Sequence, residues 1–283
     1  MNIAIATCNK VPTLTDSEKL LIPLYLQKGI IAAPEVWNST KVKWEKYEVI
    51  IIRSLWDYHL RPKLFLTWLS LLKSLGIKVL NDANIIKENH NKFYLKNLEK
   101  KGVSIVPTQY IPSGQPLEVD ELNWDKMVIK PAISASSYRT KLFKKEEFEE
   151  IQKEYEEWLK TSDYLIQKFI PEIQSFGELS IIFFNRKYSH TILKTATSNE
   201  FRVQSDFGGK SQVYKPTKRI IETAERIISM QTGDLLYARI DGTIINENFV
   251  LMEAELIEPE LFFNLAPKST NSFVNATLEL LQN

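Results

Sequence analysis

Cysteine, histidine and glycine are scarce in this sequence. The 283 residues include one cysteine, Cys8, so an internal disulfide framework and a cysteine-based zinc cluster are both excluded. Cys8 follows the first apolar segment and is interpreted as a small buried residue, not a nucleophile. The three histidines, His59, His90 and His190, are scattered, which is typical of surface or core positions rather than of metal ligands.

The common glycine-rich motifs are missing as well. The nine glycines form no Gly-x-x-x-x-Gly-Lys-Ser/Thr loop, which excludes a Walker-type phosphate site. They form no Gly-x-Gly-x-x-Gly fingerprint, which argues against a dinucleotide oxidoreductase. No Gly-x-Ser-x-Gly elbow occurs either, so a serine hydrolase is not expected.

Excess charge and long apolar runs are also lacking. Lys and Arg number 36 and Asp and Glu 35, and this balance argues against a broad nucleic-acid surface while leaving room for a local basic pocket. No apolar run approaches the ~20 residues that span a bilayer, and the start lacks a basic signal-peptide region. We therefore expect a soluble, cytoplasmic protein that binds neither nucleic acid nor membrane. Monomer and homodimer both stay open.

The order of apolar segments and turn residues predicts an α/β and α+β protein with three parts. Residues 1–85 alternate short apolar strands with helices, the pattern of an N-terminal doubly wound parallel sheet. Residues 86–170 predict a small central α+β lobe of about three strands and one helix. Residues 171–283 predict a C-terminal domain with a mixed sheet, which contains two hairpins and a closing helix.

The second of these hairpins, with its turn region between Gly242 and Asn248, carries a candidate metal site. Side chains alternate along a strand, so Arg239 shares a face with Asp241, and Glu253 shares a face with Glu255. If the strands pair, the carboxylates converge and repel one another unless a cation lies between them. Mg²⁺, bound by carboxylates and substrate phosphates, fits this set. The alternative is a solvated face with an Arg–Asp pair, but the flanking apolar residues favour the middle of a buried sheet.

A second candidate site begins at Lys130. This lysine leaves a predicted strand directly before a loop of small residues, Ala132 to Ser137. The backbone N–H groups of such a loop, and the hydroxyls of Ser134, Ser136 and Ser137, can donate to a phosphate. A solvated lysine at a strand end is the alternative.

Taken in order, these segments resemble the ATP-grasp superfamily of carboxylate–amine ligases over nearly the whole chain. The resemblance rests on Lys92 on a predicted helix, Val-Ile-Lys130-Pro with its loop, Leu165-Ile-Gln-Lys-Phe-Ile170, Gly177-Glu-Leu-Ser, Arg239-Ile-Asp241 and Glu253-Ala-Glu255. The last two look like the family's Arg-x-Asp and Glu-x-Asn metal motifs, with Glu255 in place of asparagine.

The resemblance implies an ATP-grasp fold that binds ATP and Mg²⁺, or Mn²⁺ in its place. It implies that the ATP-binding residues are Lys92, Lys130 and Ser136 at the phosphates, Gln167, Lys168, Phe169 and Ile170 at the adenine, and Glu178 at the ribose. It makes Asp241, Glu253 and Glu255 the metal ligands. It places Arg239 at the transferred phosphate, and the catalytic set is Arg239, Lys130 and Arg202.

A closer likeness is to the glutathione-synthetase-like subgroup. It rests on Arg53-Ser-Leu-Trp-Asp-Tyr58, Phe201-Arg-Val-Gln204 with Gly208-Gly209, and Glu255-Leu-Ile-Glu-Pro-Glu-Leu-Phe262. That subgroup includes the cycloserine-pathway enzyme that cyclises O-ureido-serine. The substrate contacts are predicted to be Arg53, Ser54, Asp57, Arg202, Gly208 and Gly209.

Two of these predictions have alternatives. Arg53 ends an apolar strand, at the edge where ligands of doubly wound sheets bind, so its guanidinium is predicted to grip a substrate carboxylate. The alternative is that Arg53 only pairs with Asp57 to pin the loop. The polar segment 199–210 is expected to be open without ligand and to close against the phosphates or the substrate. A plain hairpin connection is the alternative.

Together these assignments predict an ADP-forming carbon–nitrogen ligase whose partners are a small-molecule carboxylate and an amine. The carboxylate attacks the γ-phosphate of ATP, and the amine, from the same or a second molecule, then displaces phosphate from the acyl phosphate. Two other classes stay open: a nucleotide-binding regulatory protein that keeps the fold without turnover, and a phosphotransferase.

Overall fold

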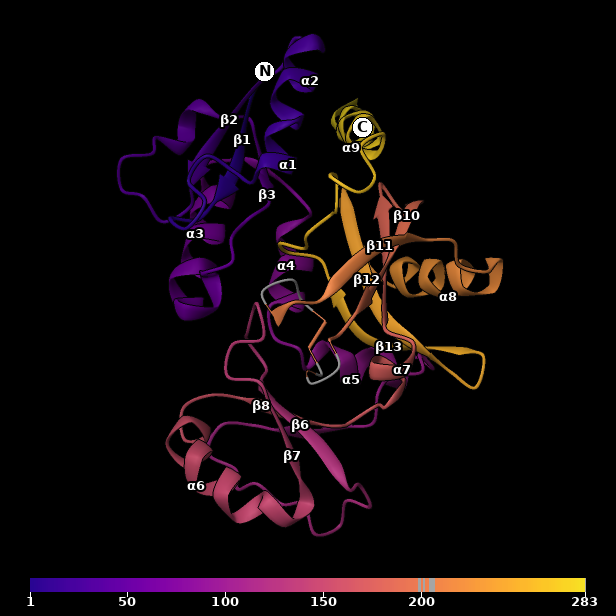
Figure 1. The fold of residues 1–283 in the computed structure, drawn as a ribbon. Helices are drawn as coiled ribbons and strands as arrows, with labels where there is room; N and C mark the ends of the chain where they lie inside the picture. Colours follow the sequence, from indigo (N-terminus) through magenta and orange to yellow (C-terminus); the bar gives the residue numbers. More distant parts are fainter. Residues whose placement is uncertain (198–199, 201, 204–206, 283) are drawn as a thin grey trace.

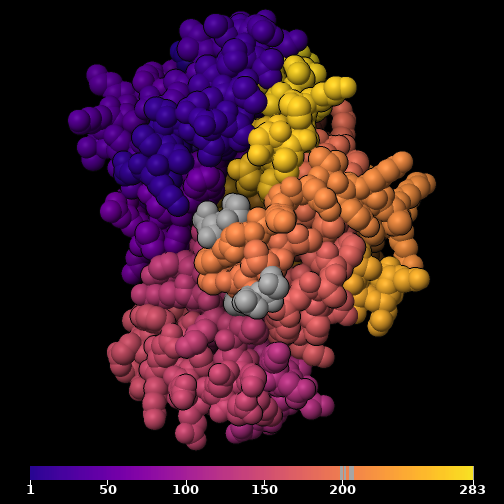
Figure 2. Space-filling model, viewed as in Figure 1, coloured from indigo at the N-terminus to yellow at the C-terminus, as the bar shows by residue number. Residues whose placement is uncertain are grey.

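The strands of this chain form three sheets, each built from a different part of the sequence. The computed structural model describes residues 1–197, 200, 202–203 and 207–282, and within them the sheets contain four, four and five strands. The N-terminal sheet and the central lobe lie at opposite ends of the molecule, and the C-terminal residues run alongside both (Figures 1 and 2). In the described stretches, no helix combines the length and apolarity needed to cross a bilayer.

The N-terminal sheet is parallel, with the strand order β2-β1-β3-β4. Its region contains β1 Asn2–Thr7, α1 Asp16–Lys19, α2 Leu21–Gln27, β2 Ile31–Val36, η1 Trp44–Lys46, β3 Val49–Ile52, η2 Tyr58–Leu60, α3 Pro62–Ser74 and β4 Lys78–Leu80. Strand β3 is buried throughout, as its unbroken apolar run predicts for a strand covered on both faces. Phe65 and Trp68 of α3 pack on one face, and Phe273 of the C-terminal helix packs on the other.

The central lobe is an antiparallel sheet with the strand order β5-β8-β6-β7. Its region contains α4 Ala83–Asn89, α5 Tyr94–Lys100, β5 Thr108–Ile111, β6 Lys126–Pro131, β7 Lys141–Lys144, η3 Lys145–Glu147, α6 Phe148–Leu159 and β8 Tyr164–Lys168. Helix α6 buries Ile151 and Tyr155 against Ile129 and Phe143 of the sheet. The sheet has four strands rather than about three, because β5 pairs with β8.

The C-terminal sheet has the strand order β11-β10-β9-β12-β13, and its neighbouring strands pair antiparallel, so it is not the mixed sheet that the sequence predicted. The elements here are α7 Glu172–Ser175, β9 Glu178–Phe184, β10 Lys187–Thr195, β11 Lys210–Tyr214, α8 Lys218–Ser229, β12 Tyr237–Ile245, β13 Asn248–Glu255 and α9 Ser269–Gln282. Strand β13 lies at the edge, where a parallel bridge joins Leu251 to Ile105. Glu253 and Glu255 therefore lie on an edge strand, and the expectation that they sit in the middle of the sheet is wrong.

The turn of the β12–β13 hairpin is shorter than the predicted turn region from Gly242 to Asn248. Strand β12 continues through Gly242 to Ile245, so Asn246 and Glu247 form the turn, both with positive φ. A side chain at position 242 would collide with the facing strand, because a Cβ there would lie 2.3 Å from the Val250 carbonyl oxygen. This glycine marks a close approach of two strands, not a turn.

We expect Gly242→Ala to lower the free energy of unfolding by about 3 kcal/mol or more, because the added methyl group overpacks a buried hairpin. Its Cβ would meet the Phe249 ring at 2.6 Å as well as the carbonyl. Gly29→Ala is the control, since a Cβ there meets nothing within 4 Å and only the positive φ of 73° opposes it. Denaturant unfolding measures both variants, and equal losses would contradict the account.

Candidate active site

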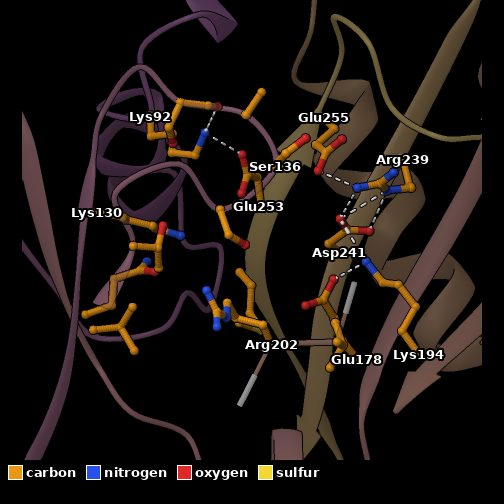
Figure 3. Close-up of a pocket in the computed structure, with 18 of the residues that line it drawn as sticks. Lys92, Lys130, Ser136, Glu178, Lys194, Arg202, Arg239, Asp241, Glu253 and Glu255 are labelled. Carbon is orange, nitrogen blue, oxygen red and sulfur yellow. Dashed lines mark hydrogen bonds and ion pairs between the residues drawn. The ribbon is translucent and has the colours of Figure 1, made fainter. Parts of the chain in front are cut away.

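A cavity of about 380 Å³ lies where the three parts of the chain meet, within the range of small-molecule sites. Lys92 and Lys130 lie on one side of it, and Glu178, Lys194, Arg239 and Asp241 on the other (Figure 3). The predicted site residues that line it are Lys92, Lys130, Ser136, Gln167, Lys168, Phe169, Ile170, Glu178, Arg202, Arg239, Asp241, Glu253 and Glu255. The cavity-lining residues of the described chain do not include Arg53, Ser54, Asp57, Gly208 or Gly209, which were predicted as substrate contacts.

Arg239 and Asp241 form a buried ion pair on β12. The guanidinium donates from Nε to Asp241 Oδ1 at 3.0 Å and from Nη2 to Oδ2 at 2.8 Å, and Nη2 also binds Glu255. Ser180 Oγ donates to Asp241 at 2.6 Å. Burial alone raises the pKa of Asp241, but Arg239 and Lys194 outweigh it and hold the pKa below its ordinary value. Asp241 is therefore a firmly ionised carboxylate.

A β-bulge brings Asp241 and Glu253 opposite each other. Gly242 pairs with Leu251, and the register then shifts by one residue so that Asp241 faces Glu253. Without the bulge, Asp241 would face Met252, and Glu253 would point to the other side of the sheet. The convergence that the sequence predicted is therefore present, but it depends on an irregularity that alternation does not reveal.

The converging carboxylates are already engaged by cations. Glu253 forms an ion pair with Lys92 Nζ at 2.8 Å, and Glu255 forms one with Arg239. Burial raises the pKa of Glu255 to about 7, and the charges of Asp241 and Glu253 add to the rise. Within the described ranges, no three His, Cys, Asp or Glu side chains are grouped to hold a metal ion. The predicted trio is thus not a preformed three-carboxylate site.

Sequence reasoning missed Lys194, which lies between two of the acidic residues. Its Nζ is 2.5 Å from Glu178 and 3.6 Å from Asp241. Burial lowers the pKa of Lys194, but Asp241 and Glu178 outweigh this and raise it above its usual value. If the register next to the hairpin turn continued without a bulge, Glu178 would pair with Leu193. A bulge between Tyr188 and His190 moves the register by one residue and substitutes Lys194.

Lys92 and Lys130 supply buried positive charge from the central lobe. Lys92 does not lie on a helix as predicted: Asn91 accepts from the Phe93 N–H at 2.9 Å and forms a turn there, between α4 and α5. Lys92 Nζ donates to the Ser134 carbonyl at 2.9 Å, which ties it to the small-residue loop. Burial lowers the pKa of Lys130, with a smaller opposing effect from Glu253.

Arg53 lies behind the cavity wall. Its side chain is 1% exposed, Nε donates to Glu18 Oε1 at 3.2 Å, and Nη2 donates to the Pro259 carbonyl at 2.6 Å. The alternative pairing with Asp57 is wrong, because Asp57 instead accepts from Trp37 Nε1 at 2.7 Å. Nε and Nη2 thus bind protein groups, while Nη1 is buried with no hydrogen-bond partner in the described residues, and Ser54, which also binds Glu18, is buried with it.

Part of the predicted closing segment is outside the described residues: positions 199, 201 and 204–206. Of the rest, Arg202 lines the cavity and donates to Glu200 at 2.6 Å. Its guanidinium lies 3.5 Å from the centre of the Phe207 ring. Closure of this segment on ligand binding stays a prediction.

Glu258 and Glu260 also line the cavity, and the sequence assigned them no role. Both belong to the Glu-Leu-Ile-Glu-Pro-Glu-Leu-Phe motif, which was the available signal. Burial raises the pKa of Glu258 well above its ordinary value, and the charge of Glu255 adds to the rise. Burial also raises the pKa of Glu260.

Solved structures resemble this chain over nearly its full length. The crystal structure of D-cycloserine synthetase DcsG aligns with a TM-score of 0.90 at 20% identity, covering 99% of this chain and 100% of that chain. A D-alanine–D-alanine ligase from Bacillus anthracis in complex with ATP aligns at 0.71 and 16% identity, covering 99% and 96%. A RimK domain ATP-grasp protein from Sphaerobacter thermophilus aligns at 0.69 and 15% identity, covering 100% of both. The chain has the ATP-grasp fold, as predicted.

Sequence comparison points to one branch within that fold. The family described as D-cycloserine synthetase DcsG, N-terminal domain, matches residues 3–81. The cycloserine biosynthesis protein DcsG of Streptomyces lavendulae is 23% identical over 176 residues, which span 59% of this chain and 58% of that protein. The predicted resemblance to the cycloserine-pathway ATP-grasp ligase is confirmed. The alignment spans less than two thirds of the curated relative.

Proposed function

We propose that this protein is an ADP-forming ligase that uses ATP to activate a small-molecule carboxylate as an acyl phosphate and joins it to an amine. The proposal rests on the ion pair between Lys92 Nζ and Glu253, at 2.8 Å. It joins the central lobe to the C-terminal sheet at a cavity that Arg239 and Asp241 also line. A polyphosphate needs cationic side chains, and its metal ion needs carboxylates, and this cavity places the two sets face to face.

ATP would lie between the central lobe and the C-terminal sheet. Lys92, Lys130 and Ser136 are proposed to bind its phosphates, and the hinge residues Gln167, Lys168, Phe169 and Ile170 its adenine. For Glu178 we keep the ribose contact. Because Glu178 is bound to Lys194 at 2.5 Å, its free lone pairs rather than an unpaired carboxylate would meet the ribose.

The donor set fits Mg²⁺, although it does not enclose one. Asp241, Glu253 and Glu255 offer hard oxygen atoms on one face of the β12–β13 hairpin, and Mg²⁺ is usually held by one or two carboxylates plus substrate phosphates. Burial raises the pKa of Glu255 to about 7, and Asp241 and Glu253 add to the rise, so a bound cation would favour the ionised form of this carboxyl. When bound, the metal would supply charge neutralisation at the transferred phosphate.

The side chains of this chain would act by position and charge. Arg239 is held by Asp241 and Glu255 and presents a fixed cation beside the phosphate, and Lys130 and Arg202 would complete the positive surround. The substrate carboxylate oxygen attacks the γ-phosphorus and ADP leaves. The amine nitrogen then attacks the acyl carbon, phosphate leaves with that oxygen, and the proton that the nitrogen loses ends on the released phosphate. No protein nucleophile is required.

The test is ADP release by the purified protein with ATP and Mg²⁺, against pooled amino acids and small carboxylic acids, with mass analysis of products. O-ureido-serine belongs in the panel because relatives bear the cycloserine name. We expect ADP and phosphate to appear together with an amide or cyclised product. A phosphorylated acid as the final product would favour a phosphotransferase, and ATP binding without turnover would favour a regulatory protein.

A further inference from the structure

The six residues 256–261, which we call the carbonyl strap, follow β13 in an irregular conformation, and every one of their carbonyl oxygens accepts a side-chain hydrogen bond. The donors to residues 256–261 in order are Asn81 Nδ2 (2.8 Å), Tyr237 OH (2.8 Å), Trp56 Nε1 (3.4 Å), Arg53 Nη2 (2.6 Å), Arg239 Nη1 (3.1 Å) and His190 Nε2 (3.0 Å). The single hydroxyl hydrogen of Tyr237 is shared with the Ile52 carbonyl, at 2.5 Å. Irregular segments usually leave such groups to water, so these donors fix the strap in one conformation.

The carbonyl strap combines buried apolar side chains with two acidic side chains that line the cavity. Leu256, Ile257 and Leu261 are no more than 2% exposed, whereas Glu258 and Glu260 line the cavity. Glu260 accepts from the Phe262 N–H at 2.8 Å and is thereby held within the chain. In the described part of the chain no donor or cation binds the Glu258 carboxylate.

Glu258 differs in this respect from the other cavity carboxylates. Asp241, Glu253 and Glu255 each have a cationic partner. Burial raises the pKa of Glu258, and the triphosphate and the substrate carboxylate, both anions, would raise it further, whereas a cationic amine would lower it and favour the carboxylate. The adenine amino group of ATP is proposed to lie at the hinge residues 167–170, so the amine substrate is the reactant whose N–H groups would donate to Glu258.

Arg53 binds the backbone of the carbonyl strap from the N-terminal region. It binds Glu18 and the Pro259 carbonyl with different nitrogens, and its guanidinium lies 4.8 Å from the centre of the Tyr237 ring. A lysine has a single nitrogen and cannot reproduce this fork. Trp56, from the same loop, holds the adjacent carbonyl of Glu258 at 3.4 Å. The N-terminal region therefore anchors the backbone on both sides of the Glu258–Pro259 peptide bond.

We propose that Glu258 binds the amine nitrogen of the substrate and that Arg53 is a positioning residue that aims Glu258 through the Pro259 carbonyl. This rests on the proposed ligase function and names the amine subsite of the same cavity. Arg53 therefore contributes to substrate selection without touching the substrate, which replaces the carboxylate contact predicted from the sequence.

The test is steady-state kinetics of Glu258→Gln, Arg53→Lys and the double variant, with the accepted acid from the ADP-release panel and hydroxylamine as the amine probe. We expect Glu258→Gln to raise the KM for hydroxylamine about 10- to 100-fold, because glutamine keeps an acceptor oxygen but loses the charge that strengthens the hydrogen bond. Arg53→Lys should raise the same constant. The double variant should be no worse than Glu258→Gln alone, because the two residues act in series. The KM values for ATP and acid should be unchanged.

Arg226→Lys is the matched control, since Arg226 also donates to a backbone carbonyl, that of Gly102 at 3.2 Å, outside the cavity. Trp56→Phe removes the neighbouring donor and replaces Arg53→Lys if that variant does not fold. Multiplying effects in the double variant, or a rise confined to the KM of the acid, would overturn the proposal. If wild-type protein turns over no acid, the ligase function fails separately. In that case the melting temperature of the protein is measured in methylammonium and in sodium salt. A higher melting temperature in methylammonium that is lost in Glu258→Gln supports the amine subsite. An equal increase in wild type and Glu258→Gln overturns it.

Discussion

Asp241→Asn and Glu253→Gln are each expected to lower kcat by about 100- to 1000-fold, the usual loss when a preorganised electrostatic group is removed from an active site. Both carboxylates lie opposite each other at the bulge, on the face that the proposed metal and phosphates would occupy. Neither change alters side-chain size. Glu247→Gln, in the exposed turn of the same hairpin, is the control and should retain full activity. Wild-type turnover in either site variant would remove the metal-ligand assignment.

The same variants have different expected stabilities. Asp241 balances Arg239 and Lys194, and its pKa is lowered, so Asp241→Asn leaves buried cations uncompensated and should lower the free energy of unfolding by about 3 kcal/mol. Glu255 has a raised pKa, so Glu255→Gln should cost little. Melting curves must therefore accompany the kinetics, so that lost activity is not mistaken for unfolding.

Lys92→Met should weaken ATP binding and lower kcat by about 100-fold. Lys92 is 6% exposed, pairs with Glu253 and donates to Ser134, so one residue connects the carboxylate edge to the small-residue loop. Methionine keeps the length of the side chain and removes its charge. Lys96→Met, exposed on helix α5, is the matched control. Calorimetric titration of ATP into both variants is the measurement, and unchanged affinity in Lys92→Met would contradict a phosphate role.

The sequence predicted the fold well because its signals are local. The buried run of β3 and the alternation along β12 and β13 each depend on neighbouring residues, and they survive in the structure. The Arg-x-Asp and Glu-x-Glu pairs likewise marked the cavity, because period-two spacing fixes which side chains share a face.

What the sequence could not supply are partners distant in the chain and breaks in register. Lys194 reaches Glu178 only because a bulge shifts β10. Arg53 reaches Glu18 and the strap across 35 and 206 residues, so its spacing from Asp57 was misleading. A residue at the carboxyl end of a parallel strand is favoured as a ligand contact, but here packing places its guanidinium behind the site.

Oxygen tracing tests the central claim most directly. The accepted acid, labelled with ¹⁸O in its carboxylate, is turned over with ATP and Mg²⁺, and the inorganic phosphate is analysed by mass. An acyl phosphate transfers one carboxylate oxygen to phosphate, so the account predicts one ¹⁸O in each phosphate released. Phosphate without ¹⁸O, formed together with the amide product, would contradict it.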